Sequence, residues 1–255
     1  MLGTFIARWF VSEARFGAFS SFVVVLWATG VSVTQKMRGI MLERSTYQPQ
    51  WPRFQGKVAL VTGSGQGIGQ ATAFRLALEG AAVGVMDRNE ETAQSTAEAV
   101  EEMGGSSLVL VADVADPGAV TESVERLRSQ FGDVDVLVNN AGFDRPGAFL
   151  KVGPDDFRAV WEVHLLGAVN CCQACARIMI EKGDGRIVNV SSIYGKTGSK
   201  GEAAYCSVKA GLIGLTKSLA REWGRKGIRV NAVLPGLTDT PTIRDVMLPK
   251  FKEAI

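Results

Sequence analysis

Three polar side chains in the second half of the chain have residue types and a spacing that suit proton transfer. Tyr205 and Lys209 lie one helical turn apart in a segment of helical pattern, so both are expected on one helix face. A phenol has an ordinary pKa of about 10, and a neighbouring ammonium group is expected to lower it, which makes Tyr205 a candidate base or acid. Ser192 ends the predicted strand that precedes this helix and can donate to the same substrate oxygen. Together they predict oxidation of an alcohol or reduction of a carbonyl.

A tyrosine and a lysine at this spacing are common on helix surfaces, so the pair gains its weight from a glycine-rich turn earlier in the chain. The turn runs from Thr62 to Gly69, follows a short apolar strand and opens a helix near Gly67. It directs free backbone N–H groups and the positive end of a helix at one place, which favours a pyrophosphate. An ordinary glycine turn is the alternative. The expected nucleotide contacts here are Gly63, Ser64, Gln66, Gly67, Ile68 and Gly69.

An acidic residue, Asp87, follows the second predicted strand, at the usual distance after the last glycine of the turn for a ribose-binding acid. A carboxylate at this place can accept both hydroxyl groups of an adenosine ribose and repels a 2′-phosphate, which predicts NAD rather than NADP as the cofactor. The adjacent Arg88 weakens this prediction, because an arginine can pair with that phosphate. The alternative role for Asp87 is to cap the next helix.

Two further strand ends carry residues that are expected to contact the cofactor. Asp113 and Val114 follow the third predicted strand, where the adenine ring is expected. The fourth strand leads into Asn140, Ala141 and Gly142, where small residues let the backbone pass close to the cofactor ribose. Either motif alone is a weak signal, and the order of all of them along the chain supports the prediction.

These residues need a scaffold, and from Lys57 onward apolar strands alternate with helical segments through short connections. The strands are nearly continuous apolar runs, which is typical of a parallel sheet covered on both faces. The pattern predicts an α/β fold with a doubly wound, Rossmann-type parallel sheet whose ligands lie beyond the carboxyl ends of the strands. Strands are expected near 57–62, 82–87, 107–112, 134–139, 186–191 and 228–234, and helices near 68–80, 90–103, 117–131, 155–181 and 203–226.

Composition predicts one catalytic domain behind an N-terminal extension. The chain has 255 residues of which 46% are hydrophobic, enough to bury a full core. The net charge is +2, and the basic excess lies within the range 1–55, so the remainder is mildly acidic and nucleic-acid binding is not expected. We expect the extension over 1–55 and a dinucleotide-binding catalytic domain over 56–255.

Three of the four cysteines, Cys171, Cys172 and Cys175, fall within one predicted helix. Cys171 and Cys175 share a helix face, yet no second ligand pair has zinc spacing and His164 is the sole histidine. We therefore interpret the cysteines as small buried helix residues and expect no metal site. Free thiols also indicate a reducing compartment, so a cytoplasmic location is expected.

The segment 16–33 carries no charge and is just long enough to span a membrane as a helix. Basic residues lie on both sides and no small-residue cleavage site follows the apolar run, which disfavours a signal peptide. Two interpretations carry equal weight: a membrane anchor, or translation that starts at Met37 or Met41. Residues 43–55 are expected to be a linker under either one.

Over residues 56 to about 240 the chain resembles the short-chain dehydrogenase/reductase family. Five ordered motifs carry the resemblance: Thr62-Gly63-x3-Gly67-Ile-Gly69, Asn139-Asn-Ala-Gly142, Ser192, Tyr205-x3-Lys209 and Pro235-Gly236. The resemblance implies an oxidoreductase that moves a hydride between a nicotinamide cofactor and a secondary alcohol or ketone. It implies that Tyr205 is the general acid/base, that Lys209 lowers its pKa and holds the nicotinamide ribose, and that Ser192 orients the substrate oxygen.

The resemblance also predicts which residues in the last part of the chain contact the cofactor and the substrate. Phosphate-binding relatives often place a basic residue where this chain has Gln66, which adds to the prediction of NAD. The most similar members are 3-oxoacyl-thioester reductases and secondary-alcohol dehydrogenases, and complete members form homo-oligomers. Loops 143–149 and 238–247 should line the substrate pocket, and their side chains suit acyl thioesters, cyclic alcohols and sugars alike. The expected cofactor contacts in this part are Pro235, Gly236, Thr238 and Thr240.

His164 stands where the family has a catalytic asparagine. If its imidazole holds the water that relays protons, the pH profile of activity should carry an extra ionisation near the ordinary histidine pKa of about 6.5. The alternative is a histidine that is merely packed in the core.

The chain also departs from the family after Gly236, because the sequence ends at Ile255 whereas the family continues through a further helix and a seventh strand. The edge of the strand at 228–234 is therefore expected to be bare and prone to pair with other chains. Two hypotheses follow: an active dehydrogenase, which the complete set of motifs favours, and a truncated nucleotide-binding remnant without activity.

Overall fold

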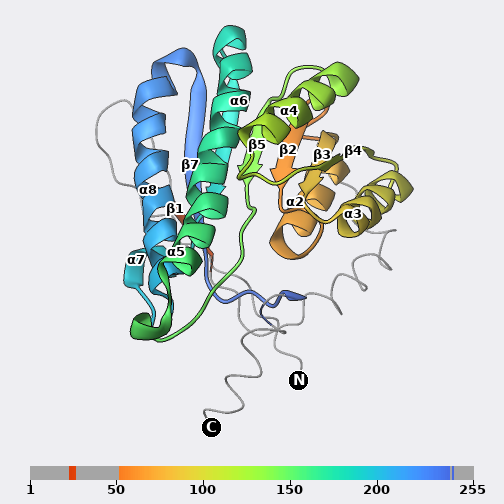
Figure 1. The fold of residues 1–255 in the computed structure, drawn as a ribbon. Coiled ribbons are helices and arrows are strands. Elements are labelled where there is room, and N and C mark those ends of the chain that lie inside the picture. Colours follow the sequence, from red (N-terminus) through yellow and green to blue (C-terminus); the bar gives the residue numbers. More distant parts are fainter. Residues whose placement is uncertain (1–22, 27–51, 242, 244–255) are drawn as a thin grey trace, which may run out of the picture.

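The computed structural model describes residues 23–26, 52–241 and 243. Within them, seven parallel strands form one sheet in the order β1-β7-β6-β5-β2-β3-β4, with helices on both faces (Figure 1). The doubly wound α/β fold predicted from the sequence is confirmed. The strands are β1 (Val23–Leu26), β2 (Val58–Thr62), β3 (Ala82–Asp87), β4 (Ser106–Val111), β5 (Val136–Asn139), β6 (Gly185–Val190) and β7 (Ile228–Pro235).

The long helices also lie where the sequence predicts them, with one exception. The predicted helix at 155–181 is divided into α5 and α6 by a π-helical turn, Glu162–Leu166. A short helix that the sequence did not indicate, α7, follows β6. The helices are α2 (Gly67–Leu78), α3 (Glu90–Glu102), α4 (Pro117–Phe131), α5 (Pro154–Trp161), α6 (Gly167–Lys182), α7 (Tyr194–Thr197) and α8 (Ala203–Trp223).

The central strand β2 is buried on both faces, which explains its continuous apolar sequence. Val58 and Leu60 belong to the core cluster that includes residues of α4 and α6. Ala59 and Val61, which point the other way, belong to the cluster that includes residues of α2 and α3. Side chains of a strand alternate between faces, so each apolar residue here faces one of two hydrophobic layers.

The interpretation of the cysteines as core residues is confirmed. Cys171, Cys172 and Cys175 are each at most 1% exposed on α6, and they belong to the cluster beneath α4. The helical stretch Pro154–Lys182 is the one in the described part of the chain that is long and apolar enough to cross a membrane. Half of its most apolar window is buried inside the protein, as befits a core helix.

The direction of the chain reverses at β2, which lies between β3 and β5. The chain first builds β3 and β4 on one side of β2 and then returns to add β5, β6 and β7 on the other. In sheets of this kind a crevice opens beyond the carboxyl ends of the strands at the reversal. The functional site is therefore expected next to Thr62 and Asn139.

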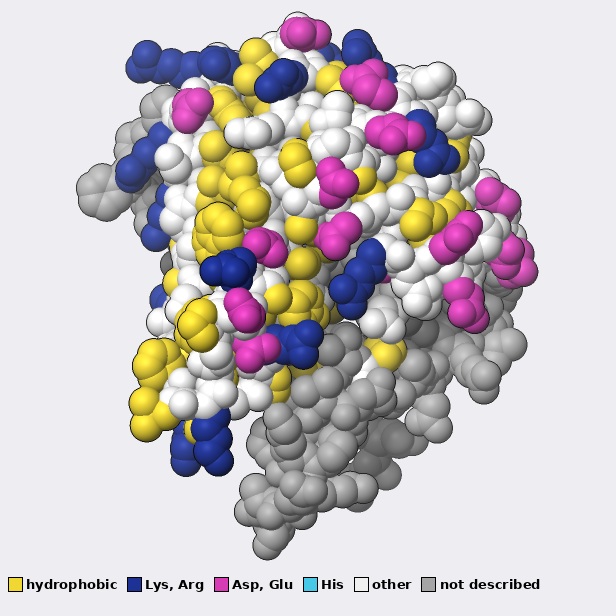
Figure 2. Space-filling model, in the orientation of Figure 1, with side chains coloured by type: hydrophobic (Ala, Val, Ile, Leu, Met, Phe, Trp, Pro, Cys, Tyr) yellow, Lys and Arg dark blue, Asp and Glu magenta, His cyan; other side chains and the backbone are white. Residues whose placement is uncertain are grey.

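On the face shown in Figure 2, acidic and basic side chains are interspersed over the described part of the surface. No broad basic patch appears among the described residues in this view.

The expectation that the edge beyond β7 is bare is wrong. β1 pairs with β7 in parallel, with Val23 opposite Ala232 and Leu26 opposite Pro235. An apolar run of a few residues suits a buried strand as well as a membrane segment, and here the unpaired edge of β7 selects the strand. β1 lies inside the predicted membrane span, and residues bound into this sheet cannot also cross a bilayer. The membrane-anchor interpretation is not supported, and the rest of 16–33 lies outside the described residues.

Replacing both Val24 and Val25 by proline is expected to detach β1 from β7. Neighbouring residues of a parallel strand turn their N–H groups to opposite sides, so one of the two prolines must remove a hydrogen-bond donor of the ladder. We expect the free energy of unfolding to fall by about 1–3 kcal/mol and the exposed edge of β7 to promote aggregation. Denaturant unfolding and light scattering measure the two effects.

The control for this variant replaces Val24 and Val25 by isoleucine, which keeps both backbone N–H groups and suits a strand. It should match the wild type in both measurements. Equal stability of the variant with prolines at Val24 and Val25 would show that β1 does not protect the edge of the sheet.

Candidate active site

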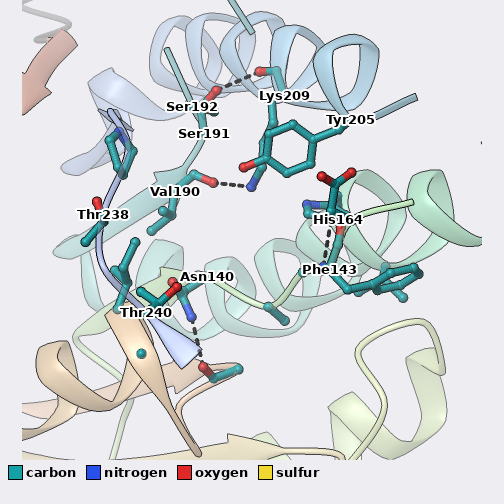
Figure 3. A pocket seen from close by; sticks show the side chains of 18 of the residues that line it. Asn140, Phe143, His164, Val190, Ser191, Ser192, Tyr205, Lys209, Thr238 and Thr240 are labelled. Carbon is teal, nitrogen blue, oxygen red and sulfur yellow. Dashed lines mark hydrogen bonds between the residues drawn. The ribbon is translucent and has the colours of Figure 1, made fainter. Parts of the chain in front are cut away.

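A cavity of about 350 Å³ opens beyond the carboxyl ends of β2, β3, β5, β6 and β7, where the topology predicts a ligand site. Its walls contain residues from both halves of the sheet, and Figure 3 shows how their side chains converge. All but two of the residues predicted from the sequence line it. They are Gly63, Gln66, Gly67, Ile68, Asp87, Arg88, Asp113, Val114, Asn140, Ala141, Gly142, His164, Ser192, Tyr205, Lys209, Pro235, Gly236, Thr238 and Thr240.

The two exceptions, Ser64 and Gly69, support the glycine-rich turn from behind. The Ser64 hydroxyl is fully buried and donates to the carbonyl of Val61 at 2.8 Å. A Cβ atom at Gly69 would lie 2.2 Å from the carbonyl oxygen of Gly63, so the turn can pack against the helix only if this residue is glycine. Both residues lie behind the cavity wall, so their position does not support the prediction that they contact the cofactor.

Hydrogen bonds join the glycine-rich turn to the loop after β5. The Thr62 hydroxyl oxygen accepts from the backbone N–H groups of Asn140 and Ala141, each at 3.0 Å. The Asn140 side-chain amide donates back to the carbonyls of Thr62 and Gly63 at 3.0 and 2.9 Å. The contact is so close that a Cβ atom at Gly63 would lie 2.7 Å from the backbone of Ala141. These hydrogen bonds therefore fix the position of the glycine-rich turn relative to the loop after β5.

The amino end of α2 faces the cavity and is suited to an anion. Gly67, its first residue, has a φ of +59°, a left-handed conformation that favours glycine. No acidic residue lies in the first turn of α2, so the positive end of the helix is not neutralised. Thr240 closes this part of the cavity, since its Cγ2 atom lies 3.4 Å from the place of a Cβ on Gly67.

Asp87 lines the cavity at the end of β3 and also shapes the glycine-rich turn. One carboxylate oxygen accepts from the backbone N–H of Gly65 at 2.9 Å, and the other accepts from that of Asn89 at 3.1 Å. The side chain of Asn89, not Asp87, caps α3 by accepting from Thr92. The alternative of a helix cap for Asp87 is therefore not supported, and its carboxylate retains further acceptor sites toward the cavity.

Asp113 and Val114 follow β4 and form the adjoining wall of the cavity. Asp113 fixes the bend of this segment, because its carboxylate accepts from the backbone N–H of Ala115 at 2.9 Å. The Val114 side chain packs against the start of α6, where a Cβ atom on Gly167 would lie 2.6 Å from it. The segment therefore approaches the cavity at a position set by close packing.

Tyr205 and Lys209 project from α8 into the cavity, next to the end of β6 (Figure 3). The Lys209 ammonium group donates to the carbonyl of Val190 at 2.7 Å and lies 5.4 Å from the centre of the Tyr205 ring. Ser192 forms a side-chain hydrogen bond with Tyr205. Its hydroxyl also accepts from the backbone N–H of Tyr194 at 3.2 Å. The three residues expected to move a proton are thus brought together.

Burial controls the protonation of this group. It raises the pKa of the Tyr205 phenol to about 12, although the hydrogen bond with Ser192 opposes the shift. It lowers the pKa of Lys209, which is 4% exposed, to about 7. The expectation that the ammonium group lowers the pKa of Tyr205 is not met in the protein alone, because the loss of water around the phenol is the largest influence on this pKa and raises it. At neutral pH the phenol therefore carries its proton.

His164 occupies the middle of the π-helical turn between α5 and α6, a feature that is frequent at functional sites. Its Nε2 atom lies 2.6 Å from the carbonyl oxygen of Phe143, and its ring meets the Tyr205 ring edge-on at 5.6 Å between centres. Within the described part of the chain its Nδ1 atom has no hydrogen-bond partner. A Cβ atom on Gly142 would lie 2.2 Å from the ring, so glycine is needed there.

The expected ionisation of His164 near pH 6.5 is not supported. Burial, the largest cause, and the charge of Lys209 together lower the pKa of this imidazole to about 3. The ring is therefore neutral near pH 7, and its Nε2 atom contacts both the backbone N–H and the carbonyl oxygen of Phe143, at 3.0 and 2.6 Å. His164 thus ties the loop after β5 to the turn beside Tyr205 without titrating near neutral pH.

Val190 and Glu202 are two of the cavity residues that were not predicted from the sequence. The carbonyl of Val190, which accepts from Lys209, could not have been found, because a backbone acceptor leaves no trace in residue type. Glu202 lines the cavity and precedes Tyr205 by about one helical turn, a spacing that could have revealed it.

Comparison with known proteins agrees with the geometry. Residues 57–248 match the short chain dehydrogenase family. The chain is 39% identical to the 3-oxoacyl-acyl-carrier-protein reductase FabG of Escherichia coli over 192 residues, which cover 75% of this chain and 77% of the relative. The chain therefore belongs to the short-chain dehydrogenase/reductase family. It is an oxidoreductase of the type that uses NAD or NADP and acts on an alcohol or a ketone.

Solved structures show the same relationship. An NAD⁺-bound xylitol dehydrogenase superposes with a TM-score of 0.71 at 39% identity, over 72% of this chain and 71% of the other. A gluconate 5-dehydrogenase from Burkholderia cenocepacia J2315, in complex with NADP and tartrate, superposes with a TM-score of 0.73 at 37% identity, over 77% of each chain. Relatives with this fold thus include structures with either nicotinamide dinucleotide.

Replacement of Tyr205 by phenylalanine tests the assignment of the proton donor. We expect turnover to fall by about 10²–10⁴-fold, because the phenol is the group placed to exchange a proton with the substrate. Binding of NADH, measured by fluorescence, should change little. The matched variant Tyr194→Phe removes a second cavity hydroxyl and should cost less than about tenfold. Turnover of Tyr205→Phe close to that of the wild type would contradict the assignment.

The low pKa of His164 predicts sensitivity to acid. Above pH 6.5 the ring is neutral in both the folded and the unfolded state. As the pH falls from 6.5 toward 3, the unfolded state binds a proton that the folded state does not, so stability is lost. Between pH 7 and pH 4 the wild type should lose about 3 kcal/mol more than His164→Asn. Denaturant unfolding at both pH values measures this, and equal losses would indicate a solvated histidine.

Proposed function

We propose that the protein is an NAD(H)-dependent oxidoreductase in which Tyr205, Lys209 and Ser192 act on a secondary alcohol or its ketone. The observation that carries the proposal is their convergence in the same cavity as Asp87 and the amino end of α2. A remnant without activity has no need to keep this arrangement, so the alternative of a non-catalytic nucleotide-binding protein is less well supported.

The cavity fits a dinucleotide in several respects. Gly63 and Gly67 line the cavity with φ values of +61° and +59°, and a glycine turn at the start of a helix can offer backbone N–H groups to phosphates. Asp87 would accept from the adenosine ribose, and Asp113 and Val114 would border the adenine. Asn140 to Gly142 would border the other ribose. When bound, the nicotinamide ring supplies or accepts the hydride.

In the proposed mechanism the protein supplies the proton and the orientation. The Ser192 hydroxyl donates to the substrate oxygen and holds it beside Tyr205. Tyr205, protonated at neutral pH, gives its proton to that oxygen as a ketone is reduced, and takes it back when an alcohol is oxidised. Lys209, fixed by Val190, would hold the nicotinamide ribose and replace the proton on Tyr205.

The substrate class is argued from the same cavity. Relatives are named for a thioester on a carrier protein, for a polyol and for a sugar acid, which share a secondary alcohol or its ketone. Phe143 and Asp144 are the residues of loop 143–149 that line the cavity, together with Leu237 and Ile243 on the opposite side. We expect a small substrate, a homo-oligomeric enzyme and a cytoplasmic location.

Asp87 tests the preference for NAD(H). Asp87→Asn keeps an oxygen that can accept from Gly65 but removes the charge that repels a 2′-phosphate. We expect wild-type kcat/KM to be higher with NADH than with NADPH, and the variant to gain about tenfold with NADPH, equivalent to about 1.4 kcal/mol.

The control for the cofactor test is Arg88→Gln, which removes the one neighbouring guanidinium that lines the cavity in the described part of the chain. In the Asp87→Asn background it should reverse part of the gain with NADPH, because the phosphate then loses a cation. A wild-type enzyme that prefers NADPH would contradict the proposal for Asp87.

A further inference from the structure

Two carboxylates line the part of the cavity around Tyr205 and have no role in the mechanism above. Glu202 immediately precedes α8 and lies about one turn before Tyr205, so both face the cavity from the same helix. Asp144 lies on the loop after β5 and approaches from a different wall. The reacting phenol is therefore bordered by acidic groups from two separate elements.

Capping does not explain the place of Glu202 at the start of α8. It occupies the capping position of the helix, yet its side chain makes no capping hydrogen bond. The residue is 6% exposed, and a carboxylate loses much of its solvation at such a site. A buried acid that borders a reactive cavity is placed to recognise a ligand bound there.

Both carboxylates interact electrostatically with the Tyr205 phenol. After burial, which is the largest cause, the negative charges of Asp144 and Glu202 contribute to the raised pKa of Tyr205. A charge close enough to disfavour the phenolate is close enough to act on a substrate bound at the same oxygen.

Cationic side chains are sparse around Tyr205. Among the described residues that line the cavity, Lys209 and Arg88 are the basic ones, and Arg88 lies directly after β3, next to Asp87. Arg145 follows Asp144 but turns outward, over the Phe143 ring at 5.6 Å and toward Asp156 at 3.9 Å. The described substrate end is therefore rich in hydrogen-bond acceptors and poor in groups that could bind an anion.

We infer that Glu202, assisted by Asp144, is a specificity-determining residue that selects neutral polyhydroxylated substrates and disfavours anionic ones. The inference rests on the proposed function, since it concerns the substrate of the same site. A carboxylate presents about four acceptor sites, so it can bind the hydroxyl group next to the reacting carbon even when it has other partners. A substrate carboxylate at the same place would be repelled across a cavity with little water.

The test compares substrates that differ in charge or in the presence of a second hydroxyl group. Oxidation with NAD⁺ is measured for a pentitol, for the corresponding pentonate and for cyclohexanol, which has no second hydroxyl group. The wild type should favour the pentitol over the pentonate by at least about tenfold in kcat/KM. Glu202→Gln should raise KM for the pentitol by about tenfold, improve the pentonate, and leave cyclohexanol within about threefold of the wild type.

The control variant is Asp156→Asn, a carboxylate that contacts Arg145 outside the cavity. It should leave the ratio of pentitol to pentonate unchanged. If Glu202→Gln fails to fold, as judged by circular dichroism, Asp144→Asn carries the test, because Asp144 is only half-buried on a loop. It should shift the ratio in the same direction by a smaller amount.

The possible outcomes distinguish a failure of the specificity inference from a failure of the proposed function on which it rests. An active enzyme whose ratio of pentitol to pentonate is the same in the wild type, Glu202→Gln and Asp144→Asn overturns the specificity role alone. An enzyme that prefers the pentonate overturns it as well. Absence of turnover with every alcohol and ketone, with either nicotinamide cofactor, overturns the proposed function and the inference with it.

Discussion

The site depends on the hydrogen bonds that join Thr62 to Asn140 and Ala141. They connect the end of β2 to the end of β5, the two strands between which the chain reverses its direction across the sheet. The Thr62 hydroxyl oxygen accepts from two N–H groups, and the Asn140 amide donates to two carbonyls, so four hydrogen bonds join the two strand ends. The phosphate side and the proton-transfer side of the cavity could not keep their spacing without this connection.

The same closeness explains why so many residues in and directly behind the cavity wall are small. Gly63, Gly69 and Gly142 each have a neighbouring atom within 2.7 Å of the place where a Cβ would stand. The backbone of the turn, the loop after β5 and the ring of His164 are packed like a protein core, although they border a ligand site. A rigid wall of this kind fixes the orientation of Tyr205 and Ser192 before any substrate arrives.

Much of the fold and of the site could be predicted from the sequence, because both depend on signals that lie close together in the chain. Apolar runs such as that of β2 mark a strand covered on two faces, and the glycines from 63 to 69 mark the turn that follows it. Ser192, Tyr205 and Lys209 could be assigned because spacing on a helix and position at a strand end are both visible in sequence.

The features that could not be predicted depend on the surroundings of a residue in the folded protein. The π-helical turn at His164 has no signature of its own, and the order of the pKa values of Tyr205, Lys209 and His164 follows from burial, which residue type does not reveal. The strand Val23–Leu26 was not predicted, because its residues were interpreted as part of a membrane anchor or as lying before the true translation start, and only the pairing with β7 identifies the strand.

The pairing of β1 with β7 has a consequence for how the chain folds during its synthesis. Val23 is made before its partner Ala232, which follows about two hundred residues later, so this pair has one of the longest sequence separations in the sheet. At about 5–20 residues per second, the ribosome leaves the apolar strand without a partner for at least ten seconds or so. During that interval the segment is a target for chaperones and for other nascent chains. Closure of this sheet edge is therefore expected to be a late, slow step that completes a domain whose other six strands can already be paired.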